Sequence, residues 1–175
     1  WGYLPSHEQS SLKKRIMSER YDELKSTAQE RWNDLDGGAN PWIRVGTAIC
    51  GQAAGAPDVV EALKGELDRR GIQATLSEVG CFGLCYAEPL VDVKLPDGRR
   101  IFYGNVTPDM VAGLVESVLV NGDLRPDMAI AQMSGQPVDG IPNLLELPMM
   151  KDQVRVAMRN SGEIDPGDIY QYIAR

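Results

Sequence analysis

The sequence predicts an α/β fold, and two observations support this. Short segments rich in β-branched residues alternate with longer segments whose apolar residues recur at helical spacing, and glycine or proline separates most of them. The composition is that of an ordinary globular domain, with 43% hydrophobic and 25% charged residues in a chain of 175. We therefore expect a sheet covered by helices.

Charge and hydropathy disfavour several classes of partner. The net charge of −7 argues against nucleic acid, because binding a polyanion requires clustered Lys and Arg. No stretch approaches the roughly 18 consecutive apolar residues of a membrane-spanning helix, and the first residues lack the order of a secretory signal. We expect a cytoplasmic protein without a membrane span, in which an odd number of cysteines disfavours a disulfide framework.

Residues 1–40 are expected to form an N-terminal helical segment and a linker. Five apolar residues recur at roughly helical spacing and predict an amphipathic helix or a helix pair: Leu12, Ile16, Leu24, Ala28 and Trp32. The stretch NDLDGGANP that follows is rich in turn-forming residues, so a domain should begin near Pro41.

Residues 41–120 should form this domain. WIRVGTAI predicts a buried strand, and the helix after it has Pro57 in its first turn, Asp58 near its N-terminus and Gly71 at its end. The inward stripe of this helix should be Val59, Val60, Leu63 and Leu67. A second strand is expected at 73–79.

Two further strands and a helix complete the predicted domain. Alternation of apolar and polar residues in LVDVKL predicts one strand, and a PDG turn at 96–98 leads into another through RIFYG. Thr107 and Pro108 should begin a helix lined by Val111, Leu114, Val115 and Val118. The resulting order, β-α-β and then β-β-α, is that of a thioredoxin-like domain.

Residues 121–175 are expected to form an extended connector and two short helices. The connector is rich in Gly, Pro, Asp and Met without clear periodicity. The helices are expected at 150–160 and 166–174, and Asp165 should cap the second.

Two side-chain groups of this C-terminal part suggest contacts. An apolar run in the connector should need a covering surface, from a partner subunit or from a second copy of the chain in a homo-oligomer: Leu144, Leu145, Leu147, Met149 and Met150. Arg155 and Arg159 lie four residues apart, where they could contact carboxylates or a phosphate. We instead expect a solvated helix face there, with Val154, Val156 and Met158 partly buried.

Three cysteines, Cys50, Cys81 and Cys85, have the surroundings expected of a sulfur-ligated metal centre. Thiolates suit iron–sulfur clusters and zinc. Gly80 and Gly83 around the C-x-x-x-C pair let backbone amides approach sulfur closely. Cys50 lies just before the GAPD helix start, where the helix dipole favours anionic sulfur.

Three alternatives remain for these cysteines. They could simply pack in the protein, because free cysteine is among the most buried residue types. A dithiol oxidoreductase is disfavoured, because such sites use C-x-x-C followed by a helix, whereas a proline-bearing strand follows here. Zinc held by the cysteines and His7 is disfavoured as well, because His7 lies in a distant, charged N-terminal segment.

Two sequence stretches resemble a known family. GCFGLCYAEPLVDV followed by YGNVTPDMVAGLVESVL resembles the second half of the thioredoxin-like [2Fe-2S] ferredoxins, including the small iron–sulfur subunit of NADH:quinone oxidoreductase. That family has Ala-Pro after C-x-x-x-C, whereas here Glu88 stands between Ala87 and Pro89. Its first half has a C-x-x-x-x-C loop, and this chain has Gly46 near the first cysteine position and Cys50 near the second.

The C-terminal stretch resembles the segment that precedes the flavin domain in flavoprotein subunits of NADH dehydrogenases and of NAD-linked hydrogenases and formate dehydrogenases. The matching residues are Gln153, Arg155, Arg159, Asn160, Gly162, Ile164, Asp165 and Pro166. In that family FMN and NADH bind further downstream. The resemblance therefore implies FMN and NAD sites on downstream or partner regions, and no complete catalytic site in these 175 residues.

The resemblance implies an electron-transfer module of such a flavoprotein subunit. Single electrons would pass through a [2Fe-2S] cluster held by Cys50, Cys81, Cys85 and a fourth group that the sequence does not identify. The alternative is a cluster-free thioredoxin-like docking or scaffold domain of the same kind of redox complex. Both readings predict that other subunits or domains of a redox complex are the partners.

Overall fold

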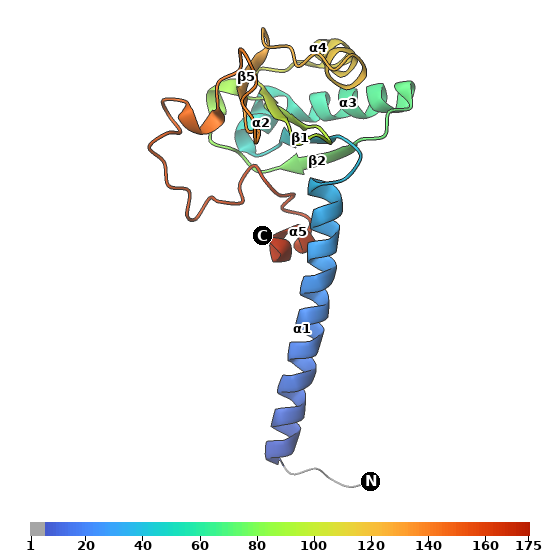
Figure 1. The fold of residues 1–175 in the computed structure, drawn as a ribbon, viewed down its shortest axis with the longest axis vertical. Coiled ribbons are helices and arrows are strands. Elements are labelled where there is room, and N and C mark those ends of the chain that lie inside the picture. Colours follow the sequence, from blue (N-terminus) through green and yellow to red (C-terminus); the bar gives the residue numbers. More distant parts are fainter. Residues whose placement is uncertain (1–5) are drawn as a thin grey trace.

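A five-stranded mixed sheet forms the centre of the molecule (Figure 1). The structure is a computed structural model that describes the backbone of residues 6–175 and the side chains of residues 17–175. The strand order is β2-β1-β3-β4-β5, with β1 and β2 parallel and the other neighbours antiparallel. The strands are β1 (Trp42–Gly46), β2 (Thr75–Val79), β3 (Val91–Lys94), β4 (Arg100–Tyr103) and β5 (Ala129–Gln132). The predicted β-α-β and β-β-α order is confirmed.

Two helices cover one face of the sheet and form the main core with it. α3 (Ala56–Arg70) follows the short α2 (Ile49–Ala54), and α4 (Pro108–Val115) follows β4. The predicted stripes of both helices are buried against alternate residues of β1, β3 and β4, as a period of two along a strand requires. Gly71 ends α3 in the left-handed region, with φ +66, as its position predicts.

The other face of the sheet is covered by the cysteine loop and the connector. Phe82 and Leu84 of the loop pack there with Phe102 of β4 and with Leu144 and Met150 of the connector. The predicted exposed apolar run is therefore wrong for Leu144 and Met150, which are buried within the chain itself, although Leu145 and Met149 are exposed. β5 was not expected, because AIAQ is short and lacks alternation; it pairs with β4 at the edge of the sheet.

The N-terminal segment is a single helix, α1 (Ser6–Asp36), which projects away from the sheet (Figure 1). Among its described side chains, those near the C-terminal end are packed: Ala28 and Trp32 are buried, and the Trp32 ring meets Trp42 of β1 edge to face at 5.6 Å. Leu24 is 36% exposed, so the predicted apolar stripe does not extend that far. The side chains of Leu12, Ile16 and His7, which the sequence analysis singled out, lie outside those the structure describes.

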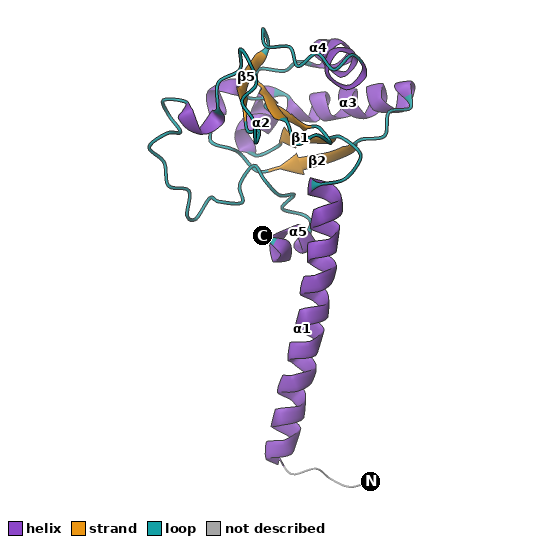
Figure 2. Cartoon of the chain, viewed as in Figure 1, coloured by secondary structure: helices purple, strands orange, loops and turns teal. Residues whose placement is uncertain are grey.

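The C-terminal part runs mostly as loop (Figure 2) and ends in α5 (Ile169–Ala174), which packs beside α1. The helix predicted at 150–160 is wrong: this segment forms isolated turns, such as Gln153 N–H to Met150 O and Ser161 N–H to Met158 O. The cap of α5 is Asp168, which accepts from Tyr170 N–H at 2.9 Å, rather than Asp165. Within the described part of the chain, no helix combines the length and hydropathy needed to cross a membrane.

Candidate metal centre

Cys81 and Cys85 form a pair of thiols in the loop after β2. Their Sγ atoms are 3.8 Å apart. Two thiolates on one tetrahedral metal, each at about 2.3 Å, would lie about 3.8 Å apart, so the pair has the spacing of two ligands of one metal. Gly83 N–H points at Cys81 Sγ from 3.2 Å, and its φ of +99 favours glycine at this position.

Cys50 lies next to this pair. It is in the first turn of α2, and not just before the longer helix α3, as the sequence had predicted. The neighbouring Cys85 side chain raises the pKa of the Cys50 thiol, through hydrogen bonding first and charge second. Cys85 is therefore the neighbour of both other cysteines: its Sγ lies 3.8 Å from Cys81 Sγ, and its side chain is near enough to Cys50 to raise the pKa of that thiol.

Glu88 is a fourth polar side chain at this place, and the sequence analysis treated it only as a departure from a motif. Its side chain is buried, with 7% of the residue exposed. One carboxylate oxygen, Oε2, accepts a hydrogen bond from Leu90 N–H at 2.8 Å, whereas the buried Oε1 has no hydrogen-bond partner. Burial raises the pKa of the Glu88 carboxyl, while Leu90 N–H and the Cys81 side chain oppose this.

Gly46 at the end of β1 explains the position of this carboxylate. A Cβ atom added at Gly46 would lie 3.0 Å from each carboxylate oxygen of Glu88 and 3.4 Å from its Cδ, and these are the nearest atoms to it. The carboxylate of Glu88 therefore fills the space into which a side chain at residue 46 would point. The sequence hints at this pairing only through two departures from the resembled family: Gly46 stands near the position of a cysteine, and Glu88 stands between Ala87 and Pro89.

The residues present can be divided between the two irons of a [2Fe-2S] cluster. In the part of the chain that the structure describes, no three His, Cys, Asp or Glu side chains surround one point that would suit a single metal ion. A [2Fe-2S] cluster divides its four ligands between two irons. Cys81 and Cys85 have the spacing of one such pair, and Cys50 and the unpartnered Glu88 oxygen lie beside it.

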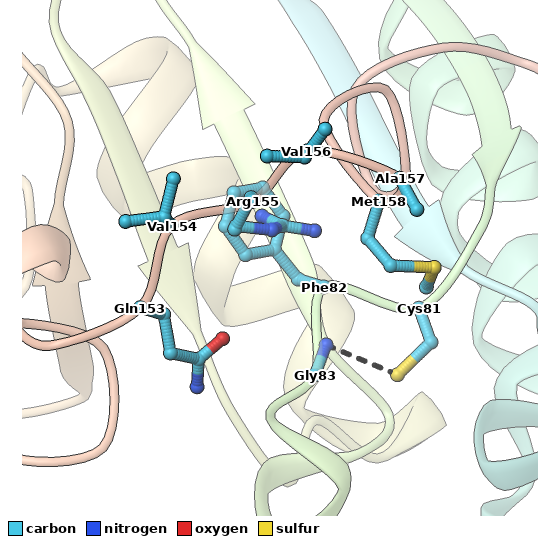
Figure 3. A pocket seen from close by; sticks show the side chains of 9 residues that line it. All are labelled: Cys81, Phe82, Gly83, Gln153, Val154, Arg155, Val156, Ala157 and Met158. Carbon is cyan, nitrogen blue, oxygen red and sulfur yellow. Dashed lines mark hydrogen bonds between the residues drawn. The ribbon is translucent and has the colours of Figure 1, made fainter.

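The C-terminal segment covers the cysteine loop. Figure 3 shows a pocket in which Cys81, Phe82 and Gly83 face residues 153–158. The Arg155 guanidinium lies 4.3 Å from the centre of the Phe82 ring and donates to Ser161 O at 2.9 Å. Ser161 Oγ–H in turn donates to Cys81 O at 2.7 Å. The cysteine loop and residues 153–161 are therefore packed against each other and joined by a hydrogen bond.

The solvated helix face predicted for the two arginines is wrong. Arg155 is half-buried over Phe82, and Arg159 donates to the backbone oxygen of Arg175 at 3.0 Å, so neither stands on a helix. The apolar residues between them were expected to be partly buried. They are instead exposed: Val154 by 87%, Val156 by 76% and Met158 by 55%.

A buried charge network joins this segment to the sheet. Asp92 of β3 accepts from Arg44 Nε of β1 and from Arg100 Nε of β4, each at 2.9 Å. Arg100 Nη1 also donates to Glu163 in the C-terminal segment, at 2.8 and 2.9 Å. Asp92 and Arg100 alternate with core residues along β3 and β4, so their side chains point away from the main core. They are still shielded from solvent, because the C-terminal segment covers them.

Comparison with known proteins finds two relatives among curated proteins, a ferredoxin and a hydrogenase subunit. A comparison with protein-family models finds no match. The chain is 41% identical to a [2Fe-2S] ferredoxin of Clostridium pasteurianum over 69 residues, which covers 38% of this chain and 65% of the ferredoxin. It is 30% identical to HndB, an NADP-reducing hydrogenase subunit of Solidesulfovibrio fructosivorans, over 100 residues, or 57% of this chain and 69% of HndB.

Among solved structures, the chain is similar to a thioredoxin-like [2Fe-2S] ferredoxin from Aquifex aeolicus. In one structure of that protein the identity is 23%, the TM-score is 0.46, and the match covers 56% of this chain and 94% of the ferredoxin. In another the identity is 22% and the TM-score is 0.45.

The chain belongs to the family of HndB, the NADP-reducing hydrogenase subunit. It spans about two thirds of the length of the curated relatives that it matches.

Proposed function

We propose that this chain is an electron-transfer module that carries a [2Fe-2S] cluster within a larger NAD(P)-linked redox complex. The observation that carries the proposal is the gathering of Cys50, Cys81 and Cys85, with the last two at the spacing of ligands on one tetrahedral metal. The ferredoxin and the hydrogenase subunit among the relatives support it. When bound, the cluster would supply a reversible carrier of one electron.

The chain's own groups would hold and tune this centre. Gly83 N–H, 3.2 Å from Cys81 Sγ, would donate to a ligand sulfur and stabilise its negative charge. The apolar cluster around Phe82 and Leu84 would restrict water on the inner side of the loop. Because Cys50 and Cys85 are exposed, the outer side would remain open to a redox partner.

The contact between the cysteine loop and residues 153–162 suggests where the electron would come from. This segment resembles the one that precedes a flavin domain, and it lies directly on Cys81 and Phe82. Residues 153–162 would hold the cysteine loop beside a flavin on a downstream or partner region, which would supply electrons, and the exposed Cys50 and Cys85 would face a second redox partner. Other subunits of a redox complex are therefore the proposed partners.

A cluster-free docking or scaffold domain is the second candidate. The exposed apolar residues Val154, Val156 and Met158 favour it, because they offer a contact surface that needs no cluster. The two candidates differ in one measurable property, which is bound iron.

The deciding experiment measures iron and acid-labile sulfide in the anaerobically purified chain, with its visible spectrum and its EPR spectrum after reduction. We expect about two irons and two sulfides per chain. Cys81→Ser and Cys85→Ser should lose the signals, whereas Tyr86→Phe, an exposed position in the same turn, should keep them. If the wild-type chain holds no iron even after reconstitution, the electron-transfer function is ruled out and the scaffold function remains.

A further inference from the structure

We propose that the Glu88 carboxylate is the fourth ligand of the iron–sulfur centre, in the space beside Gly46 that a side chain at residue 46 would otherwise occupy. This inference rests on the proposed function and names the group that completes the ligand set. It is drawn from three features of Glu88: its position, its unpartnered oxygen and the chemistry of carboxylates.

The position is that of a replaced side chain. The three atoms nearest to a Cβ at Gly46 all belong to the Glu88 carboxylate, at 3.0, 3.0 and 3.4 Å. Residue 46 ends β1, four residues before Cys50, so a cysteine there would point its sulfur toward the space that the carboxylate fills. Glu88 reaches the same space from the cysteine loop, three residues after Cys85.

The unpartnered oxygen is the second feature. Oε2 has a structural role, because it accepts from Leu90 N–H at 2.8 Å, whereas the buried Oε1 has no partner at hydrogen-bond geometry, although the Cys81 side chain lies close enough to the carboxylate to lower its pKa. A buried carboxylate normally has a cation beside it or binds a proton, because desolvation of an isolated charge is costly. The buried arginines of the described chain, Arg44 and Arg100, are paired with Asp92 and Glu163. An iron ion would supply the charge that Oε1 lacks.

Carboxylate chemistry is compatible with this role. Carboxylate oxygens ligate iron in other protein sites, and the ligand pairs on the two irons of a cluster need not be alike, since two histidines replace two cysteines in Rieske centres. One iron would take Cys81 and Cys85, which already have the required spacing. The other would take Cys50 and Glu88, and each iron would then have two protein ligands.

Three variants separate a ligand from a structural residue. Glu88→Gln keeps an oxygen that can accept from Leu90 N–H but removes the negative charge and one of the two carboxylate oxygens. Glu88→Ala removes the side chain and opens the space beside Gly46. The double variant Gly46→Cys/Glu88→Ala then places a thiol in that space and restores four possible ligands, three of them unchanged.

Iron content, the visible spectrum and EPR are measured for each variant, with far-ultraviolet circular dichroism as the folding control. We expect Glu88→Gln and Glu88→Ala to retain a native dichroism spectrum but to lose most of the roughly two irons per chain. The double variant should recover the iron. Its absorption maxima and EPR g values should differ from those of the wild type, because sulfur replaces oxygen at one iron.

The outcomes distinguish this proposal from the proposed function. If both single variants keep the wild-type iron content and EPR spectrum, Glu88 is not a ligand, and the electron-transfer function stands with another fourth group. If the wild-type chain binds no iron, the function fails and the ligand proposal fails with it. Loss of iron in Glu88→Gln with native dichroism supports the ligand role even where the double variant does not fold.

Discussion

Arg100 of β4 holds Asp92 of β3 in a two-point contact, with Nε to Oδ1 and Nη2 to Oδ2 both at 2.9 Å. Both residues are buried, with 5% and 3% exposed. Arg44 shares Asp92 from the neighbouring strand, and Glu163 completes a set of two cations and two anions. Because Glu163 belongs to the C-terminal segment, this set ties that segment to the strands beside the cysteine loop.

Asp92→Ala should destabilise the protein strongly. The substitution leaves two buried arginines with only Glu163 to balance them, and breaking a buried ion pair by removing one partner costs about 3–5 kcal/mol. Urea unfolding measures the change in the free energy of unfolding. Asp97→Ala is the matched control, because Asp97 pairs with Arg99 at an exposed turn, where an ion pair contributes about 1 kcal/mol or less. Equal effects of the two substitutions would contradict the buried network.

Glu66 on α3 should contribute to stability in a pH-dependent way. Hydrogen bonds from Arg69 and Arg70 lower the pKa of its carboxyl from 4.5 to about 2. Above pH 4.5, the pKa of this carboxyl in the unfolded chain, Glu66 is ionised in both the folded and the unfolded protein. Its full contribution to the free energy of unfolding is then present. Between about 4.5 and about 2 the unfolded chain binds the proton first, so the contribution falls as the pH falls.

Glu66→Gln should therefore lower the melting temperature at pH 7 and flatten its dependence on pH in this window. Thermal unfolding monitored by circular dichroism between pH 2 and pH 7 tests both effects. Glu61→Gln, an exposed position on the same helix, serves as the control. A melting curve of Glu66→Gln that follows the wild type across the whole range would refute the argument.

Gly65→Ala should stabilise the protein. Gly65 lies inside α3, and a Cβ atom there would meet no other atom within 4 Å. Glycine in a helix interior is less favourable than alanine by about 0.5–1 kcal/mol, chiefly because the unfolded chain is more flexible. Urea unfolding should show an increase of that size in the free energy of unfolding, and a decrease would indicate a contact that the structure does not contain.

Sequence predicted those parts of the fold that local patterns determine. The stripes of α3 and α4, the glycine that ends α3 and the strands on either side of the PDG turn depend on periodicity and on turn residues, which any single sequence displays. The segment 150–160 has a partly helical pattern, but its conformation is determined by contacts with Phe82 and Cys81 far away in the sequence.

Only part of the candidate centre was predictable, because a single sequence shows local patterns but not contacts between distant residues. Cys50, Cys81 and Cys85 could be named from residue type and spacing, and that they form the ligand set remains a proposal. Glu88 could not be given a role, because its relation to Gly46 exists only across β1 and the cysteine loop, which lie some forty residues apart in sequence. The burial of Asp92 likewise depends on the segment that covers it and not on the alternation within its strand.

The packing of the C-terminal segment on the cysteine loop can be tested at Gly162. Its φ is +79, and a Cβ atom there would lie 2.3 Å from Cδ2 of Phe82. Gly162→Ala should therefore suffer both backbone strain, which costs about 1–3 kcal/mol, and a clash that pushes the segment off the loop. Gly98→Ala is the matched control, because its φ is +88 but a Cβ atom there meets nothing within 4 Å. Urea unfolding should show a larger loss for Gly162→Ala, and limited proteolysis should cleave residues 150–160 faster in this variant alone. If the two variants behave alike, the segment does not pack against Phe82 in solution, and the proposed route from a downstream flavin to the cysteines loses its structural basis.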